Sequence, residues 1–210
     1  MDAFFAGPGP VYRIVSPRLV IRCWQPKDAP LLKKAIDQSR EHLKPWMPWA
    51  HDKPESVVKY AERLRKWRGM FDFGQDFVFG IFDRKETVVL GGTGLHTRVG
   101  DDAREIGYWI HKDHIGAGLA TETVSALLKV AFEIESIHRV EIHCDPNNKR
   151  SSAVPKKLGF TLEAVLKDRQ RFFDQWLDSM IWSIFVDQYP TSPASEIEIE
   201  AFNSTDRQIY

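Results

Sequence analysis

The stretch that determines the fold is Arg104–Glu122, which reads REIGYWIHKDHIGAGLATE. Residues 104–111 have the apolar and aromatic pattern of a strand. The glycine-containing turn His114–Gly118 then leads into a segment with apolar residues at helical spacing. A strand that turns through glycines into a helix points several backbone N–H groups at one spot. Because the helix dipole adds positive potential there, the stretch predicts an anion site suited to pyrophosphate.

Two other phosphate-binding folds fit this stretch poorly. A P-loop needs GKS or GKT, which is absent. A dinucleotide-binding fingerprint needs a third glycine, where this chain has Thr121. Moreover, Phe77–Phe82, Thr87–His96 and Arg104–His111 are three strand-like runs joined by short polar turns. Such runs predict an antiparallel meander.

The rest of the chain predicts one α/β domain. The expected element order is β, α, α, β, β, β, α, β, α, β, β, which favours a mixed sheet flanked by helices. Asp28 is expected to cap the first helix. Asp52 and Glu55 have capping-box spacing and predict the start of the second. Gly159 is expected at the C-terminal end of the last helix.

The two ends of the chain carry weaker patterns. We expect an N-terminal extension over residues 1–17, the domain over 18–187 and a tail over 188–210. Residues 160–166 and 176–186 predict strands that flank a 167–175 loop. The EIEIEAF sequence in the tail alternates like an edge strand, but a solvated tail is the prediction.

Composition excludes several classes of protein. The 210 residues include 29 basic and 29 acidic side chains, so the net charge is zero. This balance argues against direct binding to bulk nucleic acid. No apolar run has the length of a membrane span. Cys23 and Cys144 lie far apart, inside expected strands, as reduced buried thiols would. We therefore expect a cytoplasmic protein that binds neither nucleic acid nor a membrane.

Two motifs resemble the GNAT acetyltransferases, and most closely their ribosomal-protein N-terminal acetyltransferase branch. GYWIHKDHIGAGLATE, followed by HCDPNNKRSSAVPKKLGF, is similar to that branch's IGYW, WGxGxATEA, NxxS and K-L-G-F pattern. The upstream LKPWMPWA also resembles it. The resemblance covers roughly residues 16–187. It implies a GNAT fold, in which the mostly antiparallel sheet splays between two parallel strands.

The resemblance implies acetyl-CoA as co-substrate and no metal. Backbone N–H groups of residues 115–120 would hold its pyrophosphate, with help from the Thr121 hydroxyl. The pantetheine would pair with residues 108–110, and an N–H near Ile110 would polarise the thioester. Asn148 would bond the pantetheine amides or serve as a turn residue. The expected cofactor-binding residues are Trp109, Ile110, Ile115, Gly116, Ala117, Gly118, Leu119, Ala120, Thr121 and Asn148.

Four residues are candidates for a role at the reacting atoms. Glu105 lies on the strand beside the proposed thioester and is the first choice as general base; it could equally be a solvated strand residue. Glu163 and Asp168 are second choices. Ser151 would donate a hydrogen bond to the departing thiolate, unless it only caps a helix. The reaction implied is direct attack by the amine in a ternary complex.

Three positions depart from the family pattern. Asp113 stands where the signature has Gln or Arg, and Ile115 stands where the branch has Trp. Pro155 replaces the tyrosine that many of these enzymes carry on the last helix. We expect Pro155 to distort that helix or to displace its start, because proline lacks an N–H.

The acceptor is less constrained than the cofactor. Trp46, Trp49, Tyr60 and the 167–175 loop are expected to form its pocket. A protein N-terminal α-amine is the first choice, as in the ribosomal-protein branch. A small-molecule amine (an antibiotic, polyamine or amino acid) and a catalytically silent acyl-CoA-binding module stay open as alternatives. The resemblance is also compatible with a homodimer.

Overall fold

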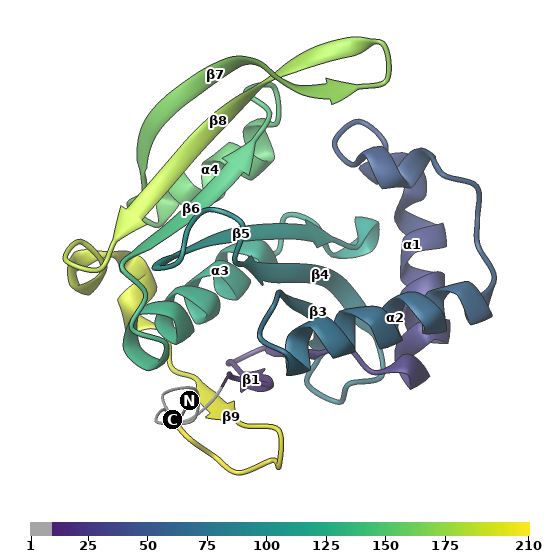
Figure 1. Ribbon diagram of the computed structural model, residues 1–210, viewed down its shortest axis with the longest axis horizontal. Helices are drawn as coiled ribbons and strands as arrows, with labels where there is room; N and C mark the ends of the chain where they lie inside the picture. The colour runs from purple at the N-terminus through teal and green to yellow at the C-terminus, as the bar shows by residue number, and fades with distance from the viewer. Residues whose placement is uncertain (1–9) are drawn as a thin grey trace.

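The computed structural model describes residues 10–210 (Figure 1). Within this range, one sheet has the strand order β7-β8-β6-β5-β4-β3-β2-β1-β9. All neighbours are antiparallel except β5 and β6. The predicted mixed sheet and its β3–β4–β5 meander are therefore confirmed. The strands are β1 Arg13–Val15, β2 Leu19–Cys23, β3 Phe77–Asp83, β4 Val89–His96, β5 Ala103–Ile110, β6 Arg139–Cys144, β7 Thr161–Phe172, β8 Gln175–Phe185 and β9 Glu200–Phe202.

Helices cover both faces of the sheet (Figure 1). One face packs against α1 and α2, with Trp24 and Phe82 buried between them and the sheet. The other packs against α3, which buries Ile106 and Ile142. The α-helices are α1 Ala29–Leu43, α2 Val57–Asp72, α3 Leu119–Lys129 and α4 Lys149–Lys157. Short helical turns are η2 Pro26–Asp28, η3 Pro48–His51, η4 Lys112–His114, η5 Val130–Ile134, η6 Tyr189–Thr191 and η7 Pro193–Glu196.

Strand alternation sends successive β5 side chains to opposite faces. Ile106, Tyr108 and Ile110 belong to the core under α3. Trp109 packs into the core under α1 and α2. Glu105 has the same parity as Trp109 and therefore points to the α1–α2 face. This alternation later decides which groups reach the site from each side.

The second helix begins later than predicted. Its N-cap is Ser56, whose hydroxyl accepts from the Lys59 N–H at 3.3 Å. The expected capping box at Asp52 and Glu55 is wrong, because Asp52 ends η3 and the Glu55 carboxylate pairs with Arg63. The three-residue spacing of two acids does not distinguish a capping box from acids that have unrelated roles.

The expected 167–175 loop is also wrong. β7 and β8 form one long hairpin that turns at residues 173–174, where Phe173 has φ +54°. Most β7 side chains are exposed. The strand therefore lacks the buried alternation that would have revealed it in the sequence.

The C-terminal segment is part of the domain core. β9 pairs with β1, and Ala201 is fully buried between neighbours. Tyr189 is also buried, and its hydroxyl donates to Glu133 at 2.8 Å. The prediction of a solvated tail is wrong, and the edge-strand alternative holds. β1 likewise lies inside the predicted N-terminal extension, of which residues 1–9 fall outside the described residues.

No helix within residues 10–210 combines the length and the apolar character needed to cross a membrane.

The C-terminal packing can be tested at Ala201. Ala201→Asp places a carboxylate in a site that is 0% exposed, so we expect a loss of at least ~2 kcal/mol in unfolding free energy. For a chain of this size, this lowers the Tm by roughly 4–8 °C. The neighbouring exposed Glu200→Ala serves as control and should change stability by less than about 0.5 kcal/mol. Equal Tm values for both variants would contradict a packed β9.

Candidate active site

β5 and β6 separate soon after they pair. Their parallel register covers only Ala103–Glu105 opposite Arg139–Glu141. Beyond it, β5 continues along β4 and β6 continues along β8. The two strands therefore diverge, as Figure 1 shows.

A large cavity occupies this divergence. Its volume is about 1540 Å³, and it is lined by Tyr108 and Ile110 of β5 and by Ile142 and Cys144 of β6. Small-molecule pockets usually measure about 300–1,000 Å³. The cavity therefore has room for a large cofactor together with an acceptor.

The backbone of β5 is exposed to this cavity at alternate residues. The His111 N–H donates to the Leu90 carbonyl at 2.8 Å, which fixes the alternation of the β4–β5 ladder. Trp109 therefore exchanges its hydrogen bonds with β4, while the N–H and C=O groups of Tyr108 and Ile110 face β6. The β5–β6 register does not reach Tyr108 or Ile110. These groups are available to an extended ligand.

The glycine turn after β5 has the geometry of an anion site. Gly116 and Gly118 have φ +75° and +77°, a left-handed conformation that side chains other than glycine adopt at a cost. Gly118 is the N-cap of α3, so the first N–H groups of the helix point toward the turn. A Cβ at Gly116 would meet nothing within 4 Å. The space above the turn is therefore open to a ligand.

An ion pair holds this turn against the start of β2. The Glu122 carboxylate accepts from the Ser16 hydroxyl at 2.7 Å and from the Arg18 Nε at 2.5 Å. Arg18 Nη1 also donates to the Ala117 carbonyl at 2.8 Å. Sequence reasoning missed Arg18. The sequence feature that could have revealed it is Glu122, because an acid in the first turn of a helix that is expected to bind phosphate needs a basic partner.

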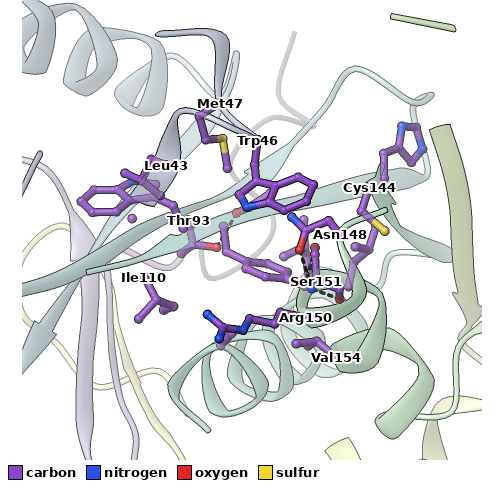
Figure 2. A pocket seen from close by; sticks show the side chains of 18 of the residues that line it. Leu43, Trp46, Met47, Thr93, Ile110, Cys144, Asn148, Arg150, Ser151 and Val154 are labelled. Atoms are coloured by element: carbon purple, nitrogen blue, oxygen red, sulfur yellow. Dashed lines mark hydrogen bonds between the residues drawn. The ribbon is translucent and has the colours of Figure 1, made fainter. Parts of the chain in front are cut away.

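Helix α4 closes the cavity from the α3 side. Its N-cap is Asn148, whose Oδ1 accepts from the Ser151 N–H at 3.1 Å. Ser151 is therefore not the helix cap. Figure 2 shows Asn148 and Ser151 of α4 converging with Trp46, from the loop after α1, on the same cavity.

Of the two effects that we expected from Pro155, a displaced start of α4 is wrong. The helix runs from Lys149 to Lys157 with the proline inside it. The missing N–H would have served the Ser151 carbonyl, four residues earlier. The Tyr108 hydroxyl donates to that carbonyl at 3.0 Å and lies 3.2 Å from Ser151 Oγ. Thus β5 supplies the hydrogen bond that the helix lacks and contacts the candidate donor. Burial raises the pKa of Tyr108 well above its ordinary value.

Glu105 is buried and already paired. Arg98 donates a hydrogen bond to each carboxylate oxygen, one from Nε at 2.7 Å and one from Nη2. Burial alone would raise the pKa of Glu105, but the hydrogen bonds and charge of Arg98 outweigh it and lower the pKa. Glu105 is therefore not a solvated strand residue, and it is a weaker proton acceptor than an unpaired glutamate.

Aromatic residues surround the side of the cavity under α1. Trp49 packs edge-on against Trp109 with ring centroids 6.1 Å apart. His51 contacts the hairpin residue Phe173 at 4.7 Å between centroids. The β7–β8 hairpin and the loop after α1 thus meet, and both contribute lining residues to the cavity. Tyr60, in contrast, is buried in the core and does not line the cavity.

The structure brings most of the predicted site residues together. The cavity is lined by the following members of that set: Trp46, Trp49, Glu105, Trp109, Ile110, Ile115, Gly116, Gly118, Leu119, Ala120, Thr121, Asn148 and Ser151. Ala117 stands outside the lining and contributes its carbonyl to Arg18. Asp113 is exposed and bonds Lys112. Glu163 and Asp168 are exposed hairpin residues outside the cavity.

Comparison with known proteins agrees with this geometry. Residues 18–161 match the model of the acetyltransferase (GNAT) domain. The [ribosomal protein uS5]-alanine N-acetyltransferase of Escherichia coli is 29% identical over 83% of this chain and 91% of its own length. The ribosomal-protein-serine acetyltransferase of the same organism is 30% identical over 69% of this chain and 82% of its own length.

Solved structures share the fold. RimJ of Mycobacterium smegmatis, in complex with CoA-disulfide, superimposes with a TM-score of 0.78 at 24% identity. The match covers 90% of this chain and 92% of RimJ. A microcin C7 self-immunity acetyltransferase, in complex with acetyl-CoA and AMP, has a TM-score of 0.74 at 21% identity, over 80% of this chain and 93% of that one.

The contact between Tyr108 and α4 can be tested by a double-mutant cycle. Tyr108→Phe removes the donor to the Ser151 carbonyl, and we expect a loss of ~1–2 kcal/mol in unfolding free energy. In a Pro155→Ala background, the restored helical N–H satisfies that carbonyl, so the same change should cost less by at least ~0.5 kcal/mol. Urea unfolding measures both. Identical costs in the two backgrounds would mean that Tyr108 does not compensate for the proline.

Proposed function

From the premise that this chain belongs to the acetyltransferase (GNAT) domain family, we propose that it transfers the acetyl group of acetyl-CoA to a protein N-terminal α-amine. One observation carries the proposal. The N–H and C=O groups of Tyr108 and Ile110 face a cavity that continues to the left-handed glycine turn before α3. An extended chain with a charged end fits this arrangement.

The chain's residues fit acetyl-CoA along this path. The N–H groups of residues 115–120 and the Thr121 hydroxyl would hold the pyrophosphate. The pantetheine, which carries two amides, would pair with the exposed edge of β5 at residues 108–110, as an added strand does. Asn148 reaches the same cavity from α4. The N–H near Ile110 would polarise the thioester carbonyl.

The two faces of the sheet would serve opposite halves of the reaction. The amine nitrogen attacks the thioester carbon, a C–N bond forms, and the C–S bond breaks. Ser151 approaches from the α3–α4 side and would hydrogen bond the departing thiolate, while Tyr108 contacts Ser151 and holds it in place. A thiolate with a pKa near 8.5 needs little acid catalysis. The amine would enter from the opposite side, between the aromatic loop and the hairpin.

An α-amine is the acceptor that this site handles most readily. Its pKa is about 8, against about 10.4 for lysine, so at pH 7.5 the neutral fraction of the α-amine is about 200-fold larger. The two Escherichia coli relatives described above are named as acetyltransferases of ribosomal proteins.

An acceptor panel tests the proposed function. Peptides with free N-terminal alanine or serine, an N-terminally blocked peptide with one lysine, spermidine and free amino acids are incubated with acetyl-CoA and analysed by mass spectrometry. We expect acetylation of the two free N-termini, at least ~10-fold faster than that of lysine. Turnover of only the small amines would redirect the assignment to a small-molecule enzyme. Binding of acetyl-CoA with no product in the whole panel would indicate the silent module.

The glycine turn provides a second test. Gly118→Ala adds a Cβ beside the proposed phosphate site, in a left-handed conformation that costs roughly 1–2 kcal/mol. Gly74→Ala is the matched control, because Gly74 has φ +65° with nothing within 4 Å of its Cβ position. It lies outside the cavity lining. By calorimetry, the Kd for CoA should rise at least ~10-fold in the first variant only. Equal affinities would exclude the turn as the phosphate cradle.

A further inference from the structure

The acceptor side of the cavity holds a second group that could accept a proton. We propose that His143, and not Glu105, takes the proton from the attacking amine; this deepens the proposed function and rests on it. His143 lies on β6, just beyond the point where β5 and β6 separate, and it lines the cavity. It shares strand parity with Glu141 and therefore faces the acceptor side.

Its two ring nitrogens have different surroundings. Nε2 lies 2.6 Å from Glu141 Oε2, which is a short hydrogen bond. Because a carboxylate only accepts, the neutral ring must carry its proton on Nε2 there. Nδ1 lies 3.7 Å from Glu105 Oε2, too far for a hydrogen bond. Among residues 10–210 no group hydrogen bonds to Nδ1, so its lone pair can accept a proton close to the Glu105 carboxylate.

Glu105 lacks this availability. Arg98 donates a hydrogen bond to each of its oxygens, and these two bonds and the arginine charge lower the pKa of Glu105 and keep the carboxylate charged. Protonation of Glu105 would break that pair inside the protein. A buried carboxylate in this state stabilises a neighbouring cation more readily than it accepts a proton. Its role becomes that of a positioning residue for the imidazolium and for the incoming amine.

The other charges around His143 agree with this role. Glu105 comes from β5, and Arg98 comes from the segment after β4. Glu141 and its partner Arg139 belong to β6 itself, with Arg139 Nε 2.8 Å from Glu141 Oε1. β8 places the uncharged Ile181 opposite His143. Each carboxylate next to the ring is therefore balanced by one arginine, and a proton gained by the ring enters between two anions.

His96 is the nearest competitor, and its nitrogens are less available. Its Nδ1 lies 2.9 Å from Asp76 Oδ1. Its Nε2 packs over the backbone of Gly94 and Gly107, where added Cβ atoms would lie 2.3 and 3.5 Å from it. His96 is therefore held against these two glycines by its contact with Asp76.

The resulting step is balanced. The amine nitrogen forms a bond to the acetyl carbon and the C–S bond breaks. The proton lost by nitrogen goes to Nδ1 of His143, and the thiolate leaves with the former bonding pair. Ser151 hydrogen bonds that sulfur from the opposite face. His143 then returns its proton to solvent, through the cavity that it lines.

The pH dependence of turnover distinguishes the two candidates. Full-length wild type, His143→Gln and Glu105→Gln are compared on the peptide that the wild type acetylates fastest, from about pH 5.5 to about pH 9.5. The loss of a general base should lower kcat by ~100-fold or more. In His143→Gln we expect this fall, with the acidic limb reduced to the titration of the substrate α-amine itself, and an unchanged KM for acetyl-CoA. Glu105→Gln should keep the acidic limb. The reverse result would overturn the proposal.

His138→Gln is the matched control, because His138 is an exposed histidine that packs edge-on against Phe185 outside the cavity. It should keep the wild-type profile. Thermal unfolding with and without acetyl-CoA identifies any variant that has lost its fold.

A measurement without an acceptor separates this proposal from the proposed function. In ¹H–¹⁵N spectra of the full chain, neutral His143 should be the Nε2–H tautomer, with an unprotonated Nδ1. Glu141→Gln should shift the ring toward a mixture of tautomers. A neutral ring protonated at Nδ1 would exclude His143 as the base, whatever the panel of amines shows. The expected tautomer together with no acetylated amine would count against the proposed function and not against the geometry of His143.

Discussion

The early end of hydrogen bonding between β5 and β6 is the constraint on which the rest of the site depends. The two strands share only Ala103–Glu105 opposite Arg139–Glu141 before β6 follows β8 and β5 follows β4. An interior strand with unpaired N–H and C=O groups is costly unless another chain or water satisfies them. An extended ligand that carries amides of its own could therefore bind in the cavity along Tyr108 and Ile110 and hydrogen bond to these groups. The antiparallel pairing of β6 with β8 holds the strands apart, so this edge is built into the sheet and needs no local flexibility.

Side chains from distant parts of the chain hold the two helix ends that border this edge. Glu122 ties the glycine turn to Ser16 and Arg18 near the start of β2. Tyr108 supports α4 through the carbonyl that Pro155 leaves without a donor. In both cases, a polar group that local structure leaves unsatisfied finds its partner on another element. The same contacts place Ser151 and the turn relative to β5, so the groups that stabilise the fold also position the site.

Sequence periodicity predicted an element correctly where one face of that element is buried and the other is exposed. The meander, α3 with its glycine turn, and the cap glycine Gly159 follow from periodicity and turn chemistry, and the resemblance assembled them into one site. The hairpin over residues 167–175 escaped because both of its faces are exposed. The packed tail escaped because Tyr189, Ala194 and Ala201 are buried singly between more exposed neighbours. The ion pair of Arg98 with Glu105, and the contact of Tyr108 with Ser151, depend on strand pairing and on a helix placed by tertiary structure, which no spacing reveals.

Strand alternation places different chemical groups on the two faces of the sheet at the site. Even-numbered residues of β5 reach the α3–α4 side, where Tyr108 meets Ser151, and odd-numbered ones reach the side of Glu105 and His143. A thioester between the diverging strands would meet a hydroxyl pair on one face and a charged cluster on the other. Acyl transfer needs this separation, because the nucleophile must lose a proton on one side while the leaving group gains a hydrogen bond on the other. The paired arginines matter here, since Arg98 and Arg139 occupy oxygens of Glu105 and Glu141, whereas Nδ1 of His143 is 3.7 Å from the nearest of these carboxylate oxygens.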